Sequence, residues 1–322
     1  WMALLVAPVQ AFIGDLHGDF FALHSLLRHA ETVHPGCKVL FLGDMVDRGD
    51  HPFECLFLLL EWGLRRPGRL AWVAGNHDIS FELANGSEYF TAQVSPAELL
   101  QVLNQADVLR GFRRELGCFL IELGRRLPRA LLFPDGLLAT HGGFPLSDLQ
   151  AQGAQITDEA SYLDWLNSPA CLKDFTWTRI HRAPKKHPDR YSTGAQYGFK
   201  DFEAFCALKP DWFPAQRMIT GHEHPADGCA IHASYKVNPA MTLVGFGFDD
   251  LHAMPAAYQH YAETLHMGRG RTGDLPAVLT LAVDRRELEW MYPELLVEPA
   301  LPVEPSTDAA AEPSPKTIVQ EV

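Results

Sequence analysis

The chain has 322 residues, with 27 Lys and Arg against 40 Asp and Glu and a formal charge of −13. At 47% apolar residues it can bury the core of one large α/β domain or two smaller ones, which excludes an intrinsically disordered chain. Its six cysteines form no C-x-x-C pair, which argues against a disulfide scaffold and a structural zinc site and favours a reducing compartment. The acidic balance argues against a protein that coats nucleic acid, so we expect no nucleic-acid partner.

The apolar segments are too short for a membrane protein. None reaches the roughly 18 continuous apolar residues of a membrane helix. The apolar start, Trp1–Val9, lacks the basic region and the cleavage motif of a signal peptide. We therefore expect a cytoplasmic protein without a membrane partner.

Strand and helix patterns alternate along the chain. Asp19 can cap a helix because Phe20, Leu23, Leu26 and Leu27 after it share one helical face. In chain order the expected elements are a strand at Val9–Ile13, the helix after Asp19, a strand at Lys38–Leu42, a helix from Pro52 to about Arg66, a strand at Leu70–Ala74, a mostly helical segment with a helix start at Ser95–Glu98, and strands at Ala130–Phe133, Leu137–Thr140, Arg217–Thr220, Met241–Phe246 and Ala277–Val283.

The order of these elements predicts the architecture. Strand–helix–strand units come first and strands dominate later, which indicates an α/β domain with two packed sheets and helices outside, over residues 1–292. Residues 293–322 differ, with six Pro, six acidic residues and one Lys. Such a composition cannot bury enough apolar surface to offset the entropy of ordering, so we expect a disordered tail.

Polar clusters follow five of the expected strands directly. In open α/β sheets, sites form at the carboxyl ends of the strands, so these clusters can converge on one place. Their joint occurrence, in order and each at a strand end, is far more specific than any single one. The five are Gly14–Gly18 (G-D-L-H-G), Gly43–Gly49 (G-D-M-V-D-R-G), Gly75–Asp78 (G-N-H-D), His141–Gly143 (H-G-G) and Gly221–His224 (G-H-E-H).

The side chains in these clusters suit a metal site. Carboxylate oxygens, imidazole nitrogens and an Asn carbonyl bind Mn²⁺, Fe or Zn²⁺, and no thiolate is among them. Asp15 and His17 can reach one ion if the chain turns at the strand end. Asp44 could bridge two ions with its two oxygens, as in sites that hold a pair about 3.5–4 Å apart for displacement at phosphorus.

Together these motifs resemble the PPP family of metallophosphatases, the serine/threonine protein phosphatase type, within the calcineurin-like metallophosphoesterase superfamily. The resemblance covers most of residues 9–250, and the D-R-G ending at Asp47–Gly49 is typical of the PPP branch. It implies a four-layer α/β/β/α fold, in which a central β-sandwich is flanked by helices and carries a binuclear metal site at its strand ends. It also implies two divalent ions as cofactors, for which Mn²⁺ is our first expectation.

The resemblance assigns roles residue by residue. His77 resembles the general acid that protonates the leaving oxygen, and Asp47 the carboxylate that orients it. Arg48 resembles the family's phosphate-binding arginine, and Arg179 the second one of the bacterial and phage branch. The residues that resemble metal ligands are Asp15, His17 and Asp44 for the first ion and Asp44, Asn76, His141 and His222 for the second, with Asp44 bridging.

Three departures from the family pattern stand out. The usual L-R-G-N-H-E reads V-A-G-N-H-D at Val73–Asp78, and the S-A-P-N-Y loop is absent, with Gly245–Asp250 near its place. In G-H-E-H the second histidine, His224, resembles an added ligand to the first metal in the wider superfamily; an ordinary loop histidine is the alternative. The segment Arg179–Arg190 holds five Lys or Arg and one Asp, which suggests either a basic surface at the pocket mouth or a solvated loop.

The expected activity is hydrolysis of phosphomonoesters, above all of phosphoserine and phosphothreonine in proteins, with phosphotyrosine and phosphorylated small molecules as further substrates. The resemblance implies direct attack on phosphorus by a hydroxide that bridges the two metals. A symmetrical dinucleoside tetraphosphatase or another nucleotide phosphohydrolase would use the same motifs. A catalytically inactive binding module and a nucleic-acid end phosphatase are weaker alternatives.

Overall fold

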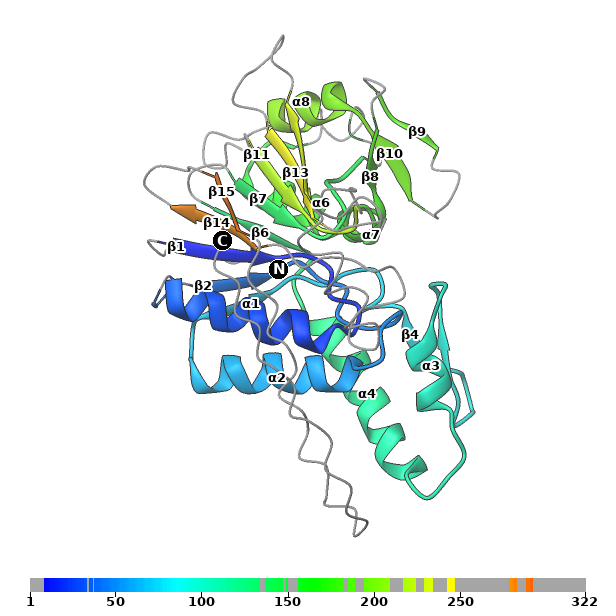
Figure 1. Cartoon of the computed structure of the whole chain (residues 1–322). Coiled ribbons are helices and arrows are strands. Elements are labelled where there is room, and N and C mark those ends of the chain that lie inside the picture. Colours follow the sequence, from blue (N-terminus) through cyan, green and yellow to red (C-terminus); the bar gives the residue numbers. More distant parts are fainter. Residues whose placement is uncertain are drawn as a thin grey trace.

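Parallel strands at the start of the chain build the first of two large sheets in this computed structural model, which describes residues 9–33, 35–36, 38–133, 137–146, 149, 156–181, 185–188, 194–208, 217–223, 229–233, 242–246, 278–282 and 288–291 (Figure 1). The sheet runs in the order β15-β14-β1-β2-β3, with β14 antiparallel to β1 and β15 antiparallel to β14. Its strands are β1 (Val9–Ile13), β2 (Lys38–Phe41), β3 (Leu70–Trp72), β14 (Val278–Ala282) and β15 (Leu288–Met291).

The second large sheet comes from the later part of the chain and lies above the first in Figure 1. Its order is β12-β13-β11-β7-β6, and β7, β11 and β13 run parallel. Its strands are β6 (Ala130–Leu132), β7 (Leu137–Thr140), β11 (Arg217–Thr220), β12 (Cys229–Ala233) and β13 (Thr242–Phe246).

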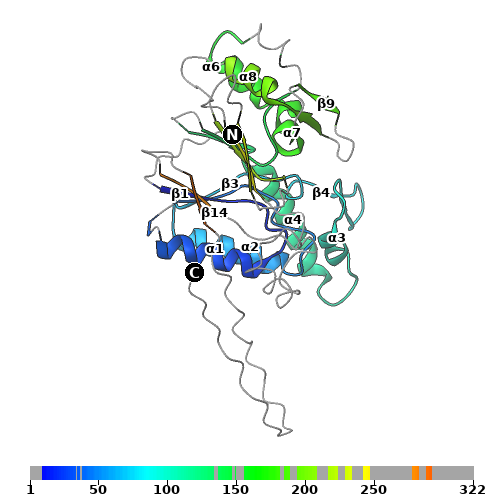
Figure 2. The ribbon, with the colours of Figure 1, turned by 45° about the horizontal axis from the view of Figure 1, so that its top comes forward.

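Helices cover the outer side of each sheet. Figure 2 shows α1 and α2 side by side beneath the β1 sheet, with α6 and α8 beyond the other sheet. Asp19 caps α1 as predicted, since its Oδ1 accepts a hydrogen bond of 2.9 Å from the Ala22 amide. The helices are α1 (Phe20–Val33), α2 (Pro52–Arg65), α6 (Glu159–Leu166), α7 (Pro169–Trp177) and α8 (Phe199–Ala207).

Side-chain alternation explains why two sheets stack. Because neighbouring strand residues point to opposite faces, Val39 and Phe41 of β2 pack into the core cluster that includes α1 and α2, while buried Leu40 faces the other way. In β6, Ala130 and Leu132 join the second core cluster, with α6 to α8. The remaining buried faces meet between the sheets, where the rings of Phe12 and Phe133 lie 6.0 Å apart.

Two smaller units project from this body. One holds a hairpin and two helices: β4 (Phe81–Leu83), β5 (Phe90–Ala92), α3 (Glu98–Leu103) and α4 (Arg110–Arg126). The other is a three-stranded sheet in the order β8-β10-β9, built from β8 (Arg179–Ile180), β9 (His187–Pro188) and β10 (Ala195–Tyr197). Figure 1 shows the first unit, with β4, α3 and α4, at the lower right and the second near α7.

The mixed α/β class is confirmed, and the predicted strands appear within two residues of their expected bounds; the largest difference is at β3, which ends at Trp72 and not at Ala74. The four-layer order remains a prediction. The helical segment after β3 was incompletely predicted, because the β4–β5 hairpin precedes α3. The turn at Pro134–Gly136, the tail at 293–322 and the loop at Gly247–Asp250 lie outside the described residues. None of the described helices is long and apolar enough to cross a membrane.

Candidate metal centre

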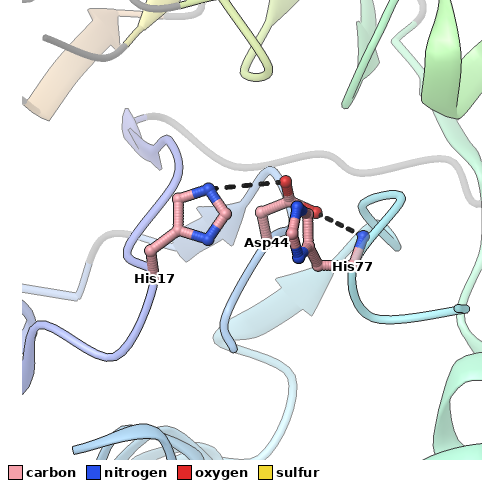
Figure 3. A group of neighbouring side chains, drawn as sticks. All are labelled: His17, Asp44 and His77. Carbon is pink, nitrogen blue, oxygen red and sulfur yellow. Dashed lines mark hydrogen bonds and ion pairs between the residues drawn. The ribbon is translucent and has the colours of Figure 1, made fainter. Parts of the chain in front are cut away.

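The loops that follow β1, β2, β3, β7 and β11 bring their polar side chains together at one edge of the two sheets. Asp44, after β2, lies at the centre. Its Oδ2 is 3.6 Å from Nε2 of His17 and 3.3 Å from Nε2 of His141. Its Oδ1 accepts a hydrogen bond of 2.9 Å from the His77 amide. Figure 3 shows Asp44 between His17 and His77, with its contacts to both.

His141 joins the second half of the cluster. Its Nε2 lies 3.0 Å from Oδ1 of Asn76 and 3.1 Å from Nδ1 of His222. Its Nδ1 lies 3.8 Å from Oδ1 of Asp15, and the same carboxylate oxygen accepts a hydrogen bond of 2.9 Å from the His222 amide. The fold therefore brings together six of the predicted ligands, from five separate loops, and His224 lies outside the described residues.

Two overlapping groups in this cluster could each hold an ion. Ligand atoms of His17, Asp44 and His77 lie within 4.8 Å of one another, and so do those of Asp44, His141 and His222. Asp44 belongs to both groups, as expected of a bridging carboxylate. His77 in the first group is a difference from the prediction, which placed it beside the ions as an acid and not among their ligands.

The chemistry of the donor set fits a cation. His17 and His141 each donate from Nδ1 to a backbone carbonyl, of Val46 at 2.9 Å and Leu42 at 2.8 Å. That bond fixes the ring so that Nε2 faces the carboxylates, which is the orientation of a metal-bound histidine. Several atoms with lone pairs thus converge on a buried space, and divalent ions would satisfy them.

The titration behaviour of the cluster without an ion supports the same interpretation. Burial alone would raise the pKa of Asp44, but the nearby His141, His77 and His17 lower it well below its usual value. Burial alone would lower the pKa of His141, but the charges of Asp44 and Asp15 raise it to about 9. Without an ion, the positive charge of protonated His141 is therefore stabilised by the two carboxylates, and a bound cation would replace that charge.

The backbone of the cluster is strained. Non-glycine residues rarely adopt a left-handed conformation, which costs on the order of 1–3 kcal/mol and is concentrated at functional sites. Every described non-glycine residue with a positive φ is one of the predicted site residues. They are His17 (45°), Asp44 (59°), Asp47 (67°), Arg48 (65°) and His222 (65°).

Two glycines are required for close approach. A Cβ at Gly75 would lie 2.1 Å from Oδ1 of Asp44, and one at Gly221 would lie 2.5 Å from Oδ1 of Asp15. Neither contact can be relieved without moving a predicted ligand. The glycine at each of these strand ends therefore makes room for the carboxylate of a neighbouring loop.

His77 and Asp47 form the predicted pair. Nδ1 of His77 donates to Oδ2 of Asp47 at 2.7 Å, and both side chains are buried. The other oxygen, Oδ1, accepts from the Leu99 amide at the start of α3, at 3.0 Å. Asp47 is thereby held from both sides, and it sets the orientation of the His77 ring.

The two predicted phosphate arginines border the cluster. The Arg48 amide donates to Oε2 of Glu98 at 3.0 Å, which ties this loop to α3. Arg179, the first residue of β8, donates from Nη1 to the carbonyl oxygen of His222 at 2.5 Å. Its guanidinium is therefore attached to the loop that carries a predicted metal ligand.

The sequence profile of the calcineurin-like phosphoesterases matches residues 10–226, about two thirds of the chain and all five loops. This chain belongs to the calcineurin-like phosphoesterase family. A probable serine/threonine-protein phosphatase of Encephalitozoon cuniculi is 25% identical over 224 residues, which is 70% of this chain and 44% of that protein. The serine/threonine-protein phosphatase 6 catalytic subunit of Caenorhabditis elegans is 27% identical over 176 residues, 54% of this chain and 47% of that protein. The chain thus spans less than half the length of these curated relatives.

A solved structure shares the fold of this phosphoesterase. It is a protein serine/threonine phosphatase from Saccharomyces cerevisiae with similarity to human phosphatase PP5, at a TM-score of 0.59 and 19% identity, covering 91% of this chain and 82% of that one. This likeness supports the predicted α/β phosphoesterase fold.

Three acidic residues of the phosphoesterase site were missed by sequence reasoning. Asp78 accepts hydrogen bonds of 2.9 Å from the amides of Asp44, Met45 and Gly75. Glu98 and Glu223 accept from the amides of Arg48 and Ile180. The sequence did carry a signal for two of them, because Asp78 lies in the G-N-H-D motif and Glu223 in the G-H-E-H motif. No local pattern marks Glu98.

Proposed function

We propose that this phosphoesterase hydrolyses phosphoserine and phosphothreonine in proteins, with a pair of divalent ions held by the Asp44-centred cluster. The observation that carries the proposal is the junction of two arrangements at one strand edge. Asp44 is shared by two groups of ligand atoms, and its carboxylate also accepts from the amide of His77, whose ring is held by Asp47. Its serine/threonine phosphatase relatives support the same substrate class.

The contacts support the ligand roles that the family resemblance implies. Asp15 and His17 would hold one ion and Asn76, His141 and His222 the other, with Asp44 between them. When bound, the ions would lower the pKa of water to provide a nucleophile near neutral pH and would stabilise charge on the phosphoryl oxygens. We propose Mn²⁺ as the physiological ion, which the mixed oxygen and nitrogen donor set supports.

His77 is proposed to act on the leaving group. Because Nδ1 donates to Asp47, the ring has a fixed orientation, and Nε2 is the atom that would give a proton to the departing serine or threonine oxygen. Asp47 can hold the ring because both of its oxygens accept hydrogen bonds, one from His77 and one from the Leu99 amide. General-acid catalysis of this kind contributes about 10²–10⁴ in rate.

Arg48 and Arg179 are proposed to bind the phosphate. A guanidinium presents paired N–H donors that match two phosphate oxygens. Nη1 of Arg179 donates to the His222 carbonyl oxygen, and the same Nη1 lies 3.6 Å from Oε2 of Glu223. Two arginines and bound cations would make the pocket attractive to a phosphate dianion, although the chain as a whole carries −13.

The extent and location of the catalytic unit are further proposals. We place the catalytic domain at residues 1–292, supported by β15, which ends at Met291 and pairs with β14 in the first sheet. We place the protein in the cytoplasm, supported by the free thiols of Cys55, Cys118, Cys171 and Cys206.

A symmetrical dinucleoside tetraphosphatase is the second candidate. Lys185 and Lys186 precede β9, which belongs to the same small sheet as Arg179, and they could bind a polyphosphate chain. The same metal cluster would serve both reactions, so the substrate must be decided by measurement.

The test is a substrate panel with the full chain loaded with Mn²⁺. We expect phosphate release from phosphoserine and phosphothreonine peptides at a higher kcat/KM than from p-nitrophenyl phosphate or diadenosine tetraphosphate. The Glu115→Gln variant, altered at an exposed residue of α4, is the control for handling and should match the wild type. A higher kcat/KM for the tetraphosphate than for both peptides would overturn the proposed substrate class.

A further inference from the structure

The small sheet β8-β10-β9 extends outward from the proposed phosphate site. Arg179 of β8 pairs with Gln196 of β10, and Gln196 pairs with His187 of β9. Neighbouring strands lie about 4.8 Å apart, so His187 is about 10 Å from Arg179 across the sheet. Since the Arg179 guanidinium contacts the His222 carbonyl, one edge of this sheet lies in the site and the other lies away from it.

Contacts across the sheet hold its outer edge in place. The His181 amide donates to the carbonyl of Tyr197 at 2.8 Å, which continues the pairing of β8 with β10. The rings of His181 and His187 meet edge to face with centroids 3.9 Å apart. The outer strand therefore has a defined position relative to Arg179.

The described residues of this surface carry an excess of positive charge. Lys185 and Lys186 precede β9 and are exposed, and no ion pair of either is found among the described residues. Lys186 lies 3.5 Å from the carbonyl oxygen of Leu146, a neutral group. The nearby carboxylate, Glu223, is engaged by the Ile180 amide at 2.7 Å and by Arg179.

Some exposed arginines elsewhere on the molecule are paired with carboxylates on their own helix. Arg65 pairs with Glu61 on α2, and Arg126 pairs with Glu122 on α4, each at 2.6 Å and four residues apart. Such pairs weaken the positive field around those two arginines. The two lysines before β9 are adjacent in the chain, and they lie beside the sheet that begins at the proposed phosphate arginine, so their charge can act on what is bound there.

We propose that this surface, Lys185–His187 with the adjoining β8-β10-β9 sheet, selects protein substrates with acidic residues near the phosphorylated one. The inference rests on the proposed function, because it concerns what flanks the phosphate. Lys185 lies two residues along the chain from His187, which puts it about 12 Å from Arg179 in the plane of the sheet. An extended peptide advances about 3.3 Å per residue, so the preferred acidic residues are three to five positions from the phosphoresidue.

The experiment compares phosphoserine peptides that differ only in charge. One carries Glu at positions three to five from the phosphoserine, on the N-terminal or the C-terminal side, and its partner carries Gln there. The full Mn²⁺-loaded chain is expected to show a three- to tenfold higher kcat/KM for a Glu peptide on one side at low salt. The ratio should fall toward one at about 0.5 M salt, because exposed charges are screened.

A double variant locates the effect. Lys185→Ala with Lys186→Ala should bring the Glu-to-Gln ratio close to one, with the Gln peptide as internal reference. The matched control, Arg65→Ala with Arg126→Ala, removes two positive charges from α2 and α4 and should keep the wild-type ratio. If both double variants lowered the ratio equally, the overall field and not this surface would be responsible, and the proposal would be wrong.

Three further outcomes of these assays would separate the surface proposal from the proposed function. Equal kcat/KM for the Glu and Gln peptides at low salt, with both peptides cleaved, would overturn the surface and leave the proposed function intact. Hydrolysis of p-nitrophenyl phosphate without cleavage of any peptide would overturn the proposed function itself. A loss of tetraphosphate cleavage in the lysine double variant, without any peptide preference, would assign the surface to polyphosphate and overturn this inference.

Discussion

Replacing Asp78 with Asn should lower the stability of the protein and weaken metal binding, although Asp78 is not itself a predicted ligand. Asp78 binds no predicted ligand side chain; its carboxylate accepts three backbone amides, from Asp44 and Gly75 on Oδ2 and from Met45 on Oδ1, each at 2.9 Å. These bonds hold the loop in which Asp44 adopts its left-handed φ of 59°. Burial and the charge of Asp44 both raise the pKa of Asp78, which means that keeping its carboxylate ionised in the folded protein costs free energy.

The magnitude follows from the geometry. Asn has one acceptor oxygen, which can keep the two bonds at the Oδ2 position, and its NH₂ group then faces the Met45 amide. One charge-assisted hydrogen bond, worth about 1.5–3 kcal/mol, is lost and a buried donor is left unsatisfied at about 1–3 kcal/mol. Relief of the buried charge offsets part of this, which leaves about 3 kcal/mol. At about 2–4 °C per kcal/mol, Tm should fall by roughly 6–12 °C.

Thermal denaturation and Mn²⁺ titration of the Asp78→Asn protein measure both consequences. We expect the lower Tm together with at least about tenfold weaker Mn²⁺ binding, because second-sphere partners typically contribute this much. Asp158→Asn is the matched control: Asp158 caps α6 through a 2.9 Å bond from the Ser161 amide, and Asn caps equally well. An Asp78→Asn protein with wild-type Tm and Mn²⁺ affinity would show that Asp78 does not support the Asp44 loop.

Three further predictions concern the cluster itself. His77→Asn should lower kcat about 10²-fold or more with metal content unchanged; an equal loss of metal would make His77 a ligand, as its place beside His17 and Asp44 allows. Gly221→Ala should abolish metal binding, since its Cβ would meet Asp15 Oδ1 at 2.5 Å, and normal metal content would contradict that packing. His141, with a pKa raised to about 9, is protonated at pH 7.5 without an ion, so Mn²⁺ binding should release about one proton per chain, measured with a pH indicator; no release would contradict the assignment.

The sequence was sufficient to predict the site edge because its residues follow strands that run parallel. Carboxyl ends of parallel strands share an edge, so the motifs had to meet although each lies 29 to 81 residues from the next one along the chain, from Asp15 to His222. The strands themselves were recognisable as apolar runs of three to five residues. Their positions, and hence the ligand set, depended on patterns that are local in the chain.

What could not be predicted depends on contacts without a local pattern. The strands β8 and β9 have two residues each, too few to show any alternation. Glu98 lies 50 residues from the Arg48 amide that it accepts from, and only the fold brings them together. The left-handed backbone at His17 is likewise set by its surroundings, because intrinsic preference disfavours that conformation.

The central claim is that Asp44 joins two ions in a working phosphatase. Metal content and phosphate release from a phosphoserine peptide, measured on the same Mn²⁺-equilibrated samples of the wild type and Asp44→Asn, test it most directly. We expect about two Mn²⁺ per wild-type chain and at most one in the variant, with phosphate release at least about 10³-fold slower. An Asp44→Asn protein that keeps two ions and releases phosphate at the wild-type rate would contradict it.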